Sequence, residues 1–537
     1  MTLSETGATR WPKSARSRWI GVLLTLACGL PATGLAGTGA IAERSVGELR
    51  SALAEGRLSS EALTSYCLAR IEALDDDLDA VIAVDPTAME QARRLDAEHR
   101  AGHLRGPLHG LPVLIKDNIE TRDQPTTAGS LALAHNDTHR DAPLVKRLRD
   151  AGLVILGKTN LSEWANFRSE RSSSGWSGVG GQTRNAYDAT RSPCGSSSGS
   201  AVAVAAGLAP LAVGTETDGS VVCPASVNGV VGIKPTVGLV SRTGVVPISH
   251  SQDTPGPFAR DVEGAALLLQ AMAGPDPDHA ATGAARGHFD LRLDRTLDSA
   301  SLKGVRIGVV RSEAGFHNEV DRLLEKAISD LQDAGAEIVD GLQFDRPEGF
   351  SAASYRVLLY EFKHDLNAYL AGLPDDALSK LTLEKLIAFN SEHARDEMPW
   401  FGQRIFEKSQ EEGGLDQEEY RDALSLVRRA TRADGIDRLV RDNDLDVLIA
   451  PTDAPAWKID LVDGDHSLGG SSTFPAVAGY PDITVPMGMV HGLPVGISFM
   501  GGAFSESRLI GIAAAYEKAR TTPVPPPGIG GEANREP

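Results

Sequence analysis

The sequence predicts an α/β protein, because segments with helical periodicity alternate with short apolar runs that are typical of buried strands. Leucine and isoleucine recur at roughly helical intervals between residues 49 and 71. Residues 153–156 and 305–310 are short apolar runs that end in glycine or contain it. A strand at 305–310, a helix near 320–334 and a strand at 337–339 form a βαβ pattern. The composition, 41% hydrophobic and 23% charged over 537 residues, is that of an ordinary folded protein.

The N-terminal segment has the features of an export signal. Four Lys or Arg residues precede an apolar stretch at 19–30, and residues 40–42 (A-I-A) form a cleavage site that leaves Glu43 as the first mature residue. A membrane anchor is the alternative, but a spanning helix needs roughly 20 apolar residues and this stretch is far shorter. The sequence therefore predicts a signal peptide at residues 1–42, no membrane span, and export to the periplasm or secretion.

The charge of the chain restricts its partners. The formal net charge is -19 at pH 7, and the first 42 residues contribute +3, which leaves about -22 for the remainder. Nucleic acids and anionic membranes are themselves negative. The net charge therefore argues against nucleic acids and anionic membranes as partners. The sequence does not indicate the oligomeric state.

The remaining chain is expected to form one large domain at residues 43–520. Within it, residues 355–444 are helical in pattern and highly charged, which predicts an insertion that covers one edge of the sheet. Residues 521–537 are too rich in Pro and Gly to pack, so we expect a disordered tail. The sequence does not show whether Cys194 and Cys223 pair.

Two motifs suggest functions that their context does not support. Residues 152–159 (G-L-V-I-L-G-K-T) fit the pattern of a phosphate-binding loop, but such a loop follows a strand, whereas L-V-I-L is itself the expected strand. His135 and His139 have a spacing found among metal ligands, but the glutamate that a zinc protease requires does not follow His135. We interpret this pair as solvated histidines in a polar loop.

A third motif raises the question of the nucleophile. Residues 195–199 (G-S-S-S-G) fit the G-x-S-x-G elbow of serine hydrolases, which would make Ser197 the nucleophile. An elbow follows a buried strand, but residues 185–194 have the pattern of a loop. The required strand and turn come later, where residues 211–213 lead into a turn that ends at Ser220. Ser220 is therefore the better candidate.

Several separated motifs resemble those of the amidase signature family. The resemblance covers roughly residues 46–520, and the motifs occur in the order found in that family. It implies an α/β fold in which helices flank both faces of a central mixed sheet. The motifs are G-L-P-V-L-I-K-D-N at 110–118, G-K-T-N at 157–160, G-S-S-S-G-S at 195–200, G-T-E-T-D-G-S at 214–220, G-I-K-P-T at 232–236, G-Y-P-D-I-T-V-P at 479–486 and G-L-P-V-G at 492–496.

The resemblance implies a catalytic triad. Ser220 corresponds to the acylated nucleophile, Ser196 to a bridging serine on a cis peptide bond, and Lys116 to the terminal base. An amide needs a relay that first removes a proton from the nucleophile and later delivers one to the leaving nitrogen. Lys116 can act only when neutral, which costs roughly 4.6 kcal/mol at pH 7 unless burial lowers its pKa. Its position after the apolar run 111–115 is compatible with burial.

The resemblance also assigns supporting roles. The backbone N–H groups of Thr217, Asp218, Gly219 and Ser220 correspond to the oxyanion hole of the family. Ser197 is expected to orient the triad, and Gly195 to relieve crowding at the cis bond. No metal or organic cofactor is implied, because the relay needs none.

The departures from the family pattern point to a subgroup. Many members have glycine where this chain has Cys194, Ser198 and Asp218, and aspartate where it has Glu216. These variants are similar to those of bacterial peptide amidases, which implies hydrolysis of the C-terminal carboxamide of peptides. The alternatives are an amidase for other small or fatty-acid amides and a binding protein without catalysis. Asp218 either repels substrates that end in a free carboxylate or turns away to cap the local turn.

Overall fold

A computed structural model describes residues 38–528, and the described residues from Ala42 onward belong to one compact unit. The predicted signal peptide lies largely outside the described residues, as does the end of the predicted C-terminal tail. Export and tail disorder therefore stay predictions. No helix between residues 38 and 528 combines the length and the apolar character needed to cross a membrane.

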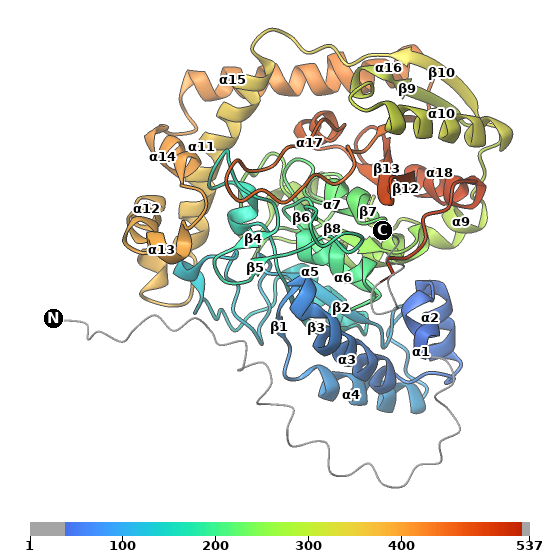
Figure 1. The fold of residues 1–537 in the computed structure, drawn as a ribbon, viewed down its shortest axis with the longest axis horizontal. Helices are drawn as coiled ribbons and strands as arrows, with labels where there is room; N and C mark the ends of the chain where they lie inside the picture. Colours follow the sequence, from blue (N-terminus) through green and yellow to red (C-terminus); the bar gives the residue numbers. More distant parts are fainter. Residues whose placement is uncertain (1–37, 529–537) are drawn as a thin grey trace, which may run out of the picture. The chain divides into compact units, whose positions relative to one another are not determined.

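A mixed sheet of eleven strands forms the centre of the described chain, and a separate two-stranded sheet accompanies it (Figure 1). The order in the large sheet is β1-β3-β2-β6-β8-β7-β12-β13-β11-β9-β10. The strands are β1 (Val81–Val84), β2 (Pro112–Lys116), β3 (Val154–Thr159), β4 (Trp176–Ser177), β5 (Gly181–Gln182), β6 (Leu211–Glu216), β7 (Val231–Lys234), β8 (Thr254–Ala259), β9 (Arg306–Val310), β10 (Glu337–Leu342), β11 (Val447–Pro451), β12 (Asp482–Val490) and β13 (Leu493–Met500).

The helices connect and cover these strands. The α-helices are α1 (Thr38–Glu43), α2 (Val46–Ala54), α3 (Ser60–Leu78), α4 (Ala88–Arg100), α5 (Pro143–Asp150), α6 (Ser198–Ala205), α7 (Val222–Val227), α8 (Val262–Met272), α9 (Leu293–Asp298), α10 (Asn318–Asp333), α11 (Phe350–Ala371), α12 (Leu383–Glu392), α13 (Ala394–Glu397), α14 (Arg404–Glu411), α15 (Glu418–Thr431), α16 (Asp437–Asp442), α17 (Thr473–Ala478) and α18 (Glu506–Ala519). Shorter helical turns are η2 (Leu131–Leu133), η3 (Glu163–Asn166), η4 (Ala280–Gly283), η5 (Arg311–Glu313), η6 (Leu378–Lys380) and η7 (Arg432–Ile436).

The side chains of β8 show that both faces of the sheet are covered. A Cβ on Gly256 would lie 3.2 Å from the Val221 side chain, next to the start of α7. A Cβ on Gly264 of α8 would lie 3.0 Å from the Cβ of Ala259. Gly256 and Ala259 are three residues apart in one strand, so a Cβ on Gly256 and the Cβ of Ala259 point to opposite faces. The predicted fold class, with helices on both faces of a mixed sheet, is confirmed.

The elements predicted from periodicity are present. Residues 154–156 of the apolar run 153–156 belong to β3, and the βαβ pattern is β9, α10 and β10, with β9 and β10 parallel. The serine run leads into α6, and residues 211–213 belong to β6, which ends just before the turn to Ser220. The strand and turn that a nucleophile needs therefore precede Ser220.

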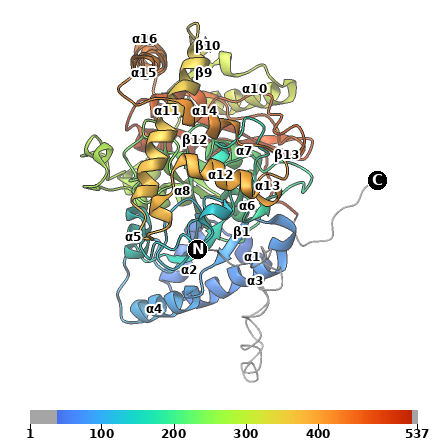
Figure 2. The same ribbon diagram turned by 90° about the vertical axis from the view of Figure 1, so that its left-hand side faces the viewer.

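Residues 350–442 contain α11 to α16, and α11 to α14 gather at one side of the sheet (Figures 1 and 2). Aromatic rings attach this segment to the chain after β3. The ring centroids of Phe167 and Phe362 lie 5.1 Å apart, and those of Trp164 and Phe406 lie 5.6 Å apart. Edge-to-face pairs of this kind add stability beyond the apolar area that they bury.

Candidate active site

The topology of three parallel strands places the site. β2 lies between β3 and β6 and is parallel to both. The carboxyl ends of the three strands therefore meet at one edge of the sheet, where the chains that leave β2 and β6 can contact each other. Lys116 is the last residue of β2, and the turn 217–220 follows β6.

Lys116 is fully buried at this edge. Its Nζ donates to Ser196 Oγ at 2.8 Å, to Thr215 Oγ1 at 2.9 Å and to the Thr215 carbonyl at 3.3 Å. Burial disfavours the charged amine and lowers the pKa of Lys116 to about 7, although the charges of Asp253 and Glu216 oppose the shift. The structure thus places a lysine that can be neutral near pH 7 in contact with the hydroxyl of Ser196.

The serine run is held by backbone and hydroxyl contacts. The peptide bond between Gly195 and Ser196 is cis, and the Ser196 carbonyl accepts from the Ser162 N–H at 3.1 Å. Ser197 Oγ donates to the Thr215 carbonyl at 3.0 Å and accepts from the Thr215 N–H at 3.1 Å. Ser197 therefore links the serine run to β6 through two hydrogen bonds of its hydroxyl, a contact that fits a supporting residue.

Ser220 lies beside the serine run through its backbone. Its carbonyl accepts from the Ser197 N–H at 3.2 Å, and the residue is 7% exposed. Within residues 38–528, Ser220 Oγ makes no hydrogen bond. The structure thus joins Lys116 to Ser196 through their side chains and Ser220 to Ser197 through their backbones. The Ser220 hydroxyl has no partner among the described residues.

The turn after β6 presents backbone N–H groups. In the described part of the chain, the N–H groups of Asp218, Gly219 and Ser220 donate no hydrogen bond. Gly219 has a φ of 79°, a left-handed conformation that glycine adopts without the penalty of a Cβ. A side chain also supports the turn, since Thr217 Oγ1 donates to Asp253 Oδ1 at 2.6 Å. Free N–H groups at such a turn suit a developing oxyanion.

The side chain of Asp218 is exposed and accepts from Ser472 Oγ at 2.6 Å. The Asp218 carboxylate is therefore bonded to Ser472, a residue distant in sequence, and not to a group of its own turn. Whether its charge disfavours carboxylate substrates stays a prediction.

Glu216, which stands where many family members have aspartate, has a structural role next to the turn. Its Oε2 accepts from the N–H groups of Val221 at 2.7 Å and of Val222 at 3.0 Å, at the start of α7. Burial raises the pKa of the Glu216 carboxyl, and the charge of the buried Lys234 opposes this shift. Glu216 therefore ties the end of β6 to the segment that follows Ser220.

Thr215 is a site residue that the sequence reasoning missed. Its hydroxyl accepts from Lys116 Nζ at 2.9 Å and from Asn118 Nδ2 at 3.0 Å. Its backbone N–H and carbonyl both form hydrogen bonds with the Ser197 hydroxyl. Asp253 was missed as well, and burial raises its pKa to about 6. The only sequence signal for Thr215 was its place inside the motif 214–220.

The pairing of two cysteines, which the sequence left open, is settled. Cys194 and Cys223 form a disulfide, and Cys67 is a buried free thiol. Cys194 directly precedes Gly195, and Cys223 lies three residues after Ser220. The bond therefore joins the two segments that carry the candidate serines.

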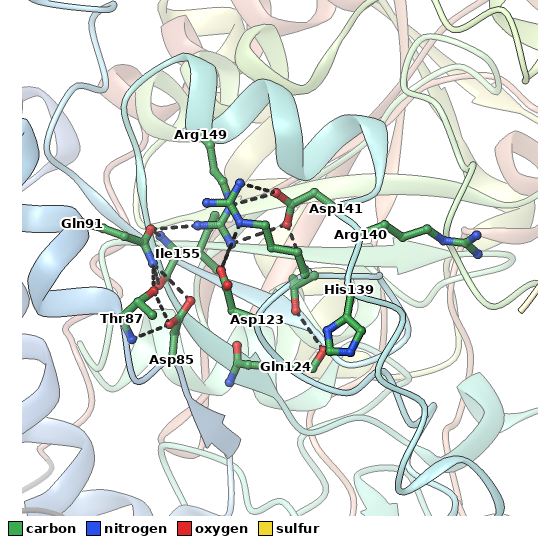
Figure 3. Close-up of polar contacts among 12 residues, drawn as sticks. Asp85, Thr87, Gln91, Asp123, Gln124, His139, Arg140, Asp141, Arg149 and Ile155 are labelled. Carbon is green, nitrogen blue, oxygen red and sulfur yellow. Dashed lines mark hydrogen bonds and ion pairs between the residues drawn. The ribbon is translucent and has the colours of Figure 1, made fainter. Parts of the chain in front are cut away.

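Figure 3 shows one residue from each of the two motifs set aside in the sequence, Ile155 and His139. The Ile155 N–H donates to Gln91 Oε1 at 3.1 Å, and β3 is buried throughout, so this backbone is not available to hold a phosphate. His139 is 79% exposed, and its Nδ1 lies 3.1 Å from Asp137 Oδ1. Neither His135 nor His139 belongs to a group of three or more metal-ligating side chains among the described residues.

Arg149 at the end of α5 is expected to be important for stability. Its side chain is 9% exposed and bonds to Asp141 at 3.0 Å and Asp123 at 2.8 Å (Figure 3). Arg149→Met would leave Asp141, which is 8% exposed, with only the longer ion pair to Arg122 at 3.6 Å. We therefore expect a loss of about 3 kcal/mol in the free energy of unfolding, at the low end of what breaking a buried ion pair costs. Denaturant unfolding measures this loss.

Lys146→Ala is the matched control, because it removes an ion pair from the same helix. The Lys146 side chain is 70% exposed and that of its partner Asp150 is 62% exposed. Its effect is expected to stay within about 0.5 kcal/mol. Equal effects of the two substitutions would contradict the assigned role of Arg149.

Comparisons with known proteins show the family of the chain. The amidase family model matches residues 62–510. A probable amidase of Arabidopsis thaliana is 41% identical over 503 residues, which cover 92% of this chain and 93% of that protein. A glutamyl-tRNA(Gln) amidotransferase subunit of Symbiobacterium thermophilum is 37% identical, and the match covers 86% of this chain and 94% of that protein.

Solved structures show the same likeness. The native peptide amidase of Stenotrophomonas maltophilia is 47% identical, with a TM-score of 0.85 over 91% of this chain and 99% of its own. A peptide amidase in complex with the competitive inhibitor chymostatin is 48% identical, with a TM-score of 0.86 over 90% of this chain and 99% of its own. The chain therefore belongs to the amidase signature family and is an amidase.

Proposed function

We propose that this amidase hydrolyses the C-terminal carboxamide of peptides to a carboxylic acid and ammonia, through an acyl-enzyme on Ser220. The observation that carries the proposal is the buried contact between Lys116 Nζ and Ser196 Oγ at 2.8 Å. Because the pKa of Lys116 is lowered to about 7, the amine can accept a proton from a hydroxyl and later return it.

In the proposed mechanism, neutral Lys116 takes the proton of Ser196 while Ser196 takes that of Ser220. The Ser220 oxygen bonds to the carbonyl carbon, and the electron pair of the C=O bond moves to its oxygen. The free N–H groups of the turn 218–220 stabilise this negative charge. The C–N bond then breaks as Lys116 returns a proton through Ser196 to the nitrogen, and ammonia leaves.

The second half of the reaction uses the same groups. The acyl chain is now an ester of Ser220, and a water molecule loses a proton to the relay as it attacks the ester carbonyl. Collapse of the second intermediate returns the proton to Ser220 and releases the carboxylic acid. Each turnover therefore consumes one water and leaves the three side chains as they began.

Two observations support peptide carboxamides as the substrate. Solved neighbours that are 47% and 48% identical are peptide amidases, and one of them binds a competitive inhibitor, chymostatin. The exposed carboxylate of Asp218, in the turn beside Ser220, favours a neutral carboxamide over a free carboxylate, since like charges repel at close range. The relative from Symbiobacterium thermophilum suggests tRNA chemistry instead, which the net charge of -19 disfavours.

Ammonia release tests the substrate. The full chain is assayed with a short peptide carboxamide, a simple aliphatic amide and a fatty-acid amide. We expect kcat/KM for the peptide carboxamide to exceed the other two by about tenfold or more, the range of discrimination that pocket contacts provide. Faster hydrolysis of the fatty-acid amide would contradict the substrate, and no ammonia from any of them would contradict the proposed catalysis.

A further inference from the structure

A cluster of imidazole and carboxylate groups lies outside the active site. It joins His250, in the loop between β7 and β8, to His364 and Asp365 of α11. One ligand atom from each of the three lies within 4.8 Å of those from the other two. The proposed amide chemistry does not use these groups, so their convergence needs its own explanation.

Both imidazoles contact the carboxylate of Asp365. His364 Nδ1 lies 2.8 Å from Oδ1, and His250 Nδ1 lies 2.9 Å from Oδ2 and 3.2 Å from Oδ1. Tetrahedral Zn²⁺ with ligands at about 2.0–2.1 Å requires neighbouring ligand atoms about 3.3 Å apart. The nitrogen-to-oxygen separations are therefore close to those that a tetrahedral cation requires.

The second oxygen of Asp365 is held by the backbone. Asp365 Oδ2 accepts from the His250 N–H at 2.7 Å, which fixes the carboxylate beside the His250 ring, and Oδ1 lies within reach of both rings. The side chains of His250 and His364 are 35% and 58% exposed, so a cation can reach them from solvent. Solvent would supply the fourth ligand.

The far side of the His250 ring has the partners expected around a metal ligand. Its Nε2 lies 3.3 Å from Glu361 Oε1 and 3.3 Å from the Tyr420 hydroxyl. The Tyr420 hydroxyl donates to Glu361 Oε1 at 2.7 Å, which leaves its oxygen free to accept from Nε2–H. Ligating histidines usually donate their second ring N–H to a carboxylate in this way, and that bond frees Nδ1 for the metal.

We propose that His250, His364 and Asp365 form a binding site for a divalent transition metal of the Zn²⁺ class. Two imidazoles and one carboxylate suit Zn²⁺ or Co²⁺, whereas Mg²⁺ and Ca²⁺ prefer sites made of oxygen alone. The bound cation links α11 to the loop 248–253. That loop holds Asp253, which accepts from Thr217 Oγ1 and from the N–H groups of Ile248 and Ser249.

The experiment measures binding of Zn²⁺ to untagged, full-length protein after treatment with a chelator. Isothermal titration with Zn²⁺ is expected to give one site per chain, and Co²⁺ to give the visible absorption of a tetrahedral complex. Zn²⁺ is also expected to raise the melting temperature, because a ligand that binds only the folded state stabilises it. These readouts are independent of amide hydrolysis.

Variants locate the site. His364→Ala removes an exposed ligand without disturbing the core, and it is expected to abolish the Co²⁺ spectrum and to weaken Zn²⁺ binding by more than tenfold. Glu361→Gln is expected to weaken binding about 10-fold to 100-fold through His250. His139→Ala is the matched control, since it removes an exposed histidine that also pairs with an aspartate. Equal binding by His364→Ala and His139→Ala, or no binding by the unaltered protein, would overturn the proposal.

Discussion

Ser220→Ala is expected to lower kcat for amide hydrolysis by about 10⁴-fold or more, the scale on which loss of a nucleophile acts. In the proposed mechanism the acyl-enzyme cannot form without this hydroxyl, and the relay from Lys116 has no nucleophile to activate. The fold should persist, because within the described chain the Ser220 hydroxyl holds no other group. Steady-state ammonia release measures the loss, and the melting temperature of the variant checks the fold.

Ser197→Ala distinguishes the two serines that fit a nucleophile motif. The Ser197 hydroxyl already bonds to the N–H and the carbonyl of Thr215, so we expect a partial loss of activity through a displaced serine run. An inactive Ser197→Ala with an active Ser220→Ala would show that the elbow motif at 195–199 carries the nucleophile.

The pH dependence of Lys116 should produce the second large effect. In the proposed mechanism the neutral amine is the active form. Because its pKa is about 7, kcat/KM for amide hydrolysis should fall about tenfold per pH unit below that value. Lys116→Met is expected to lose about 10³-fold or more of kcat, since among the described residues only Lys116 Nζ is hydrogen-bonded to Ser196 Oγ. A pH profile of kcat/KM that stays flat down to pH 5 would contradict a lysine base.

The same pKa predicts how stability changes with pH. In the unfolded chain Lys116 holds its proton up to about pH 10.5, whereas in the fold it loses that proton near pH 7. Between these values the unfolded state binds more protons, so the free energy of unfolding should rise with pH by about 1.4 kcal/mol per unit relative to Lys116→Met. Denaturant unfolding of both proteins at pH 8 and 9.5 measures this difference.

The fold could be predicted wherever burial on both faces of the sheet selects a continuous apolar run. Residues 154–156 and 307–310 are buried and lie in β3 and β9. The end of β3 could not be predicted in this way, because it includes the buried Lys158. That lysine is tolerated because Asp117, distant in sequence, lies 3.2 Å from its Nζ.

The site could be predicted only in part, for a similar reason. The apolar run before Lys116 was only compatible with burial of that side chain, which is fully buried in the structure. Thr215 could not be assigned, because its role comes from hydrogen bonds to Lys116, Asn118 and Ser197, which β2, β6 and the serine run bring together only in the fold. The cluster of His250 with His364 and Asp365 could not be predicted either, since His250 lies more than 100 residues from the other two in the sequence.

The bond between Cys194 and Cys223 has a consequence for how the enzyme matures. Protein cross-links of this type form in the periplasm or outside the cell and are rare in reducing cytosol. A polypeptide kept in the cytosol would assemble without the covalent brace that spans its two serine-bearing segments. Delivery across the membrane, which the first 42 residues predict, would then be a step in completing the catalyst as well as in locating it.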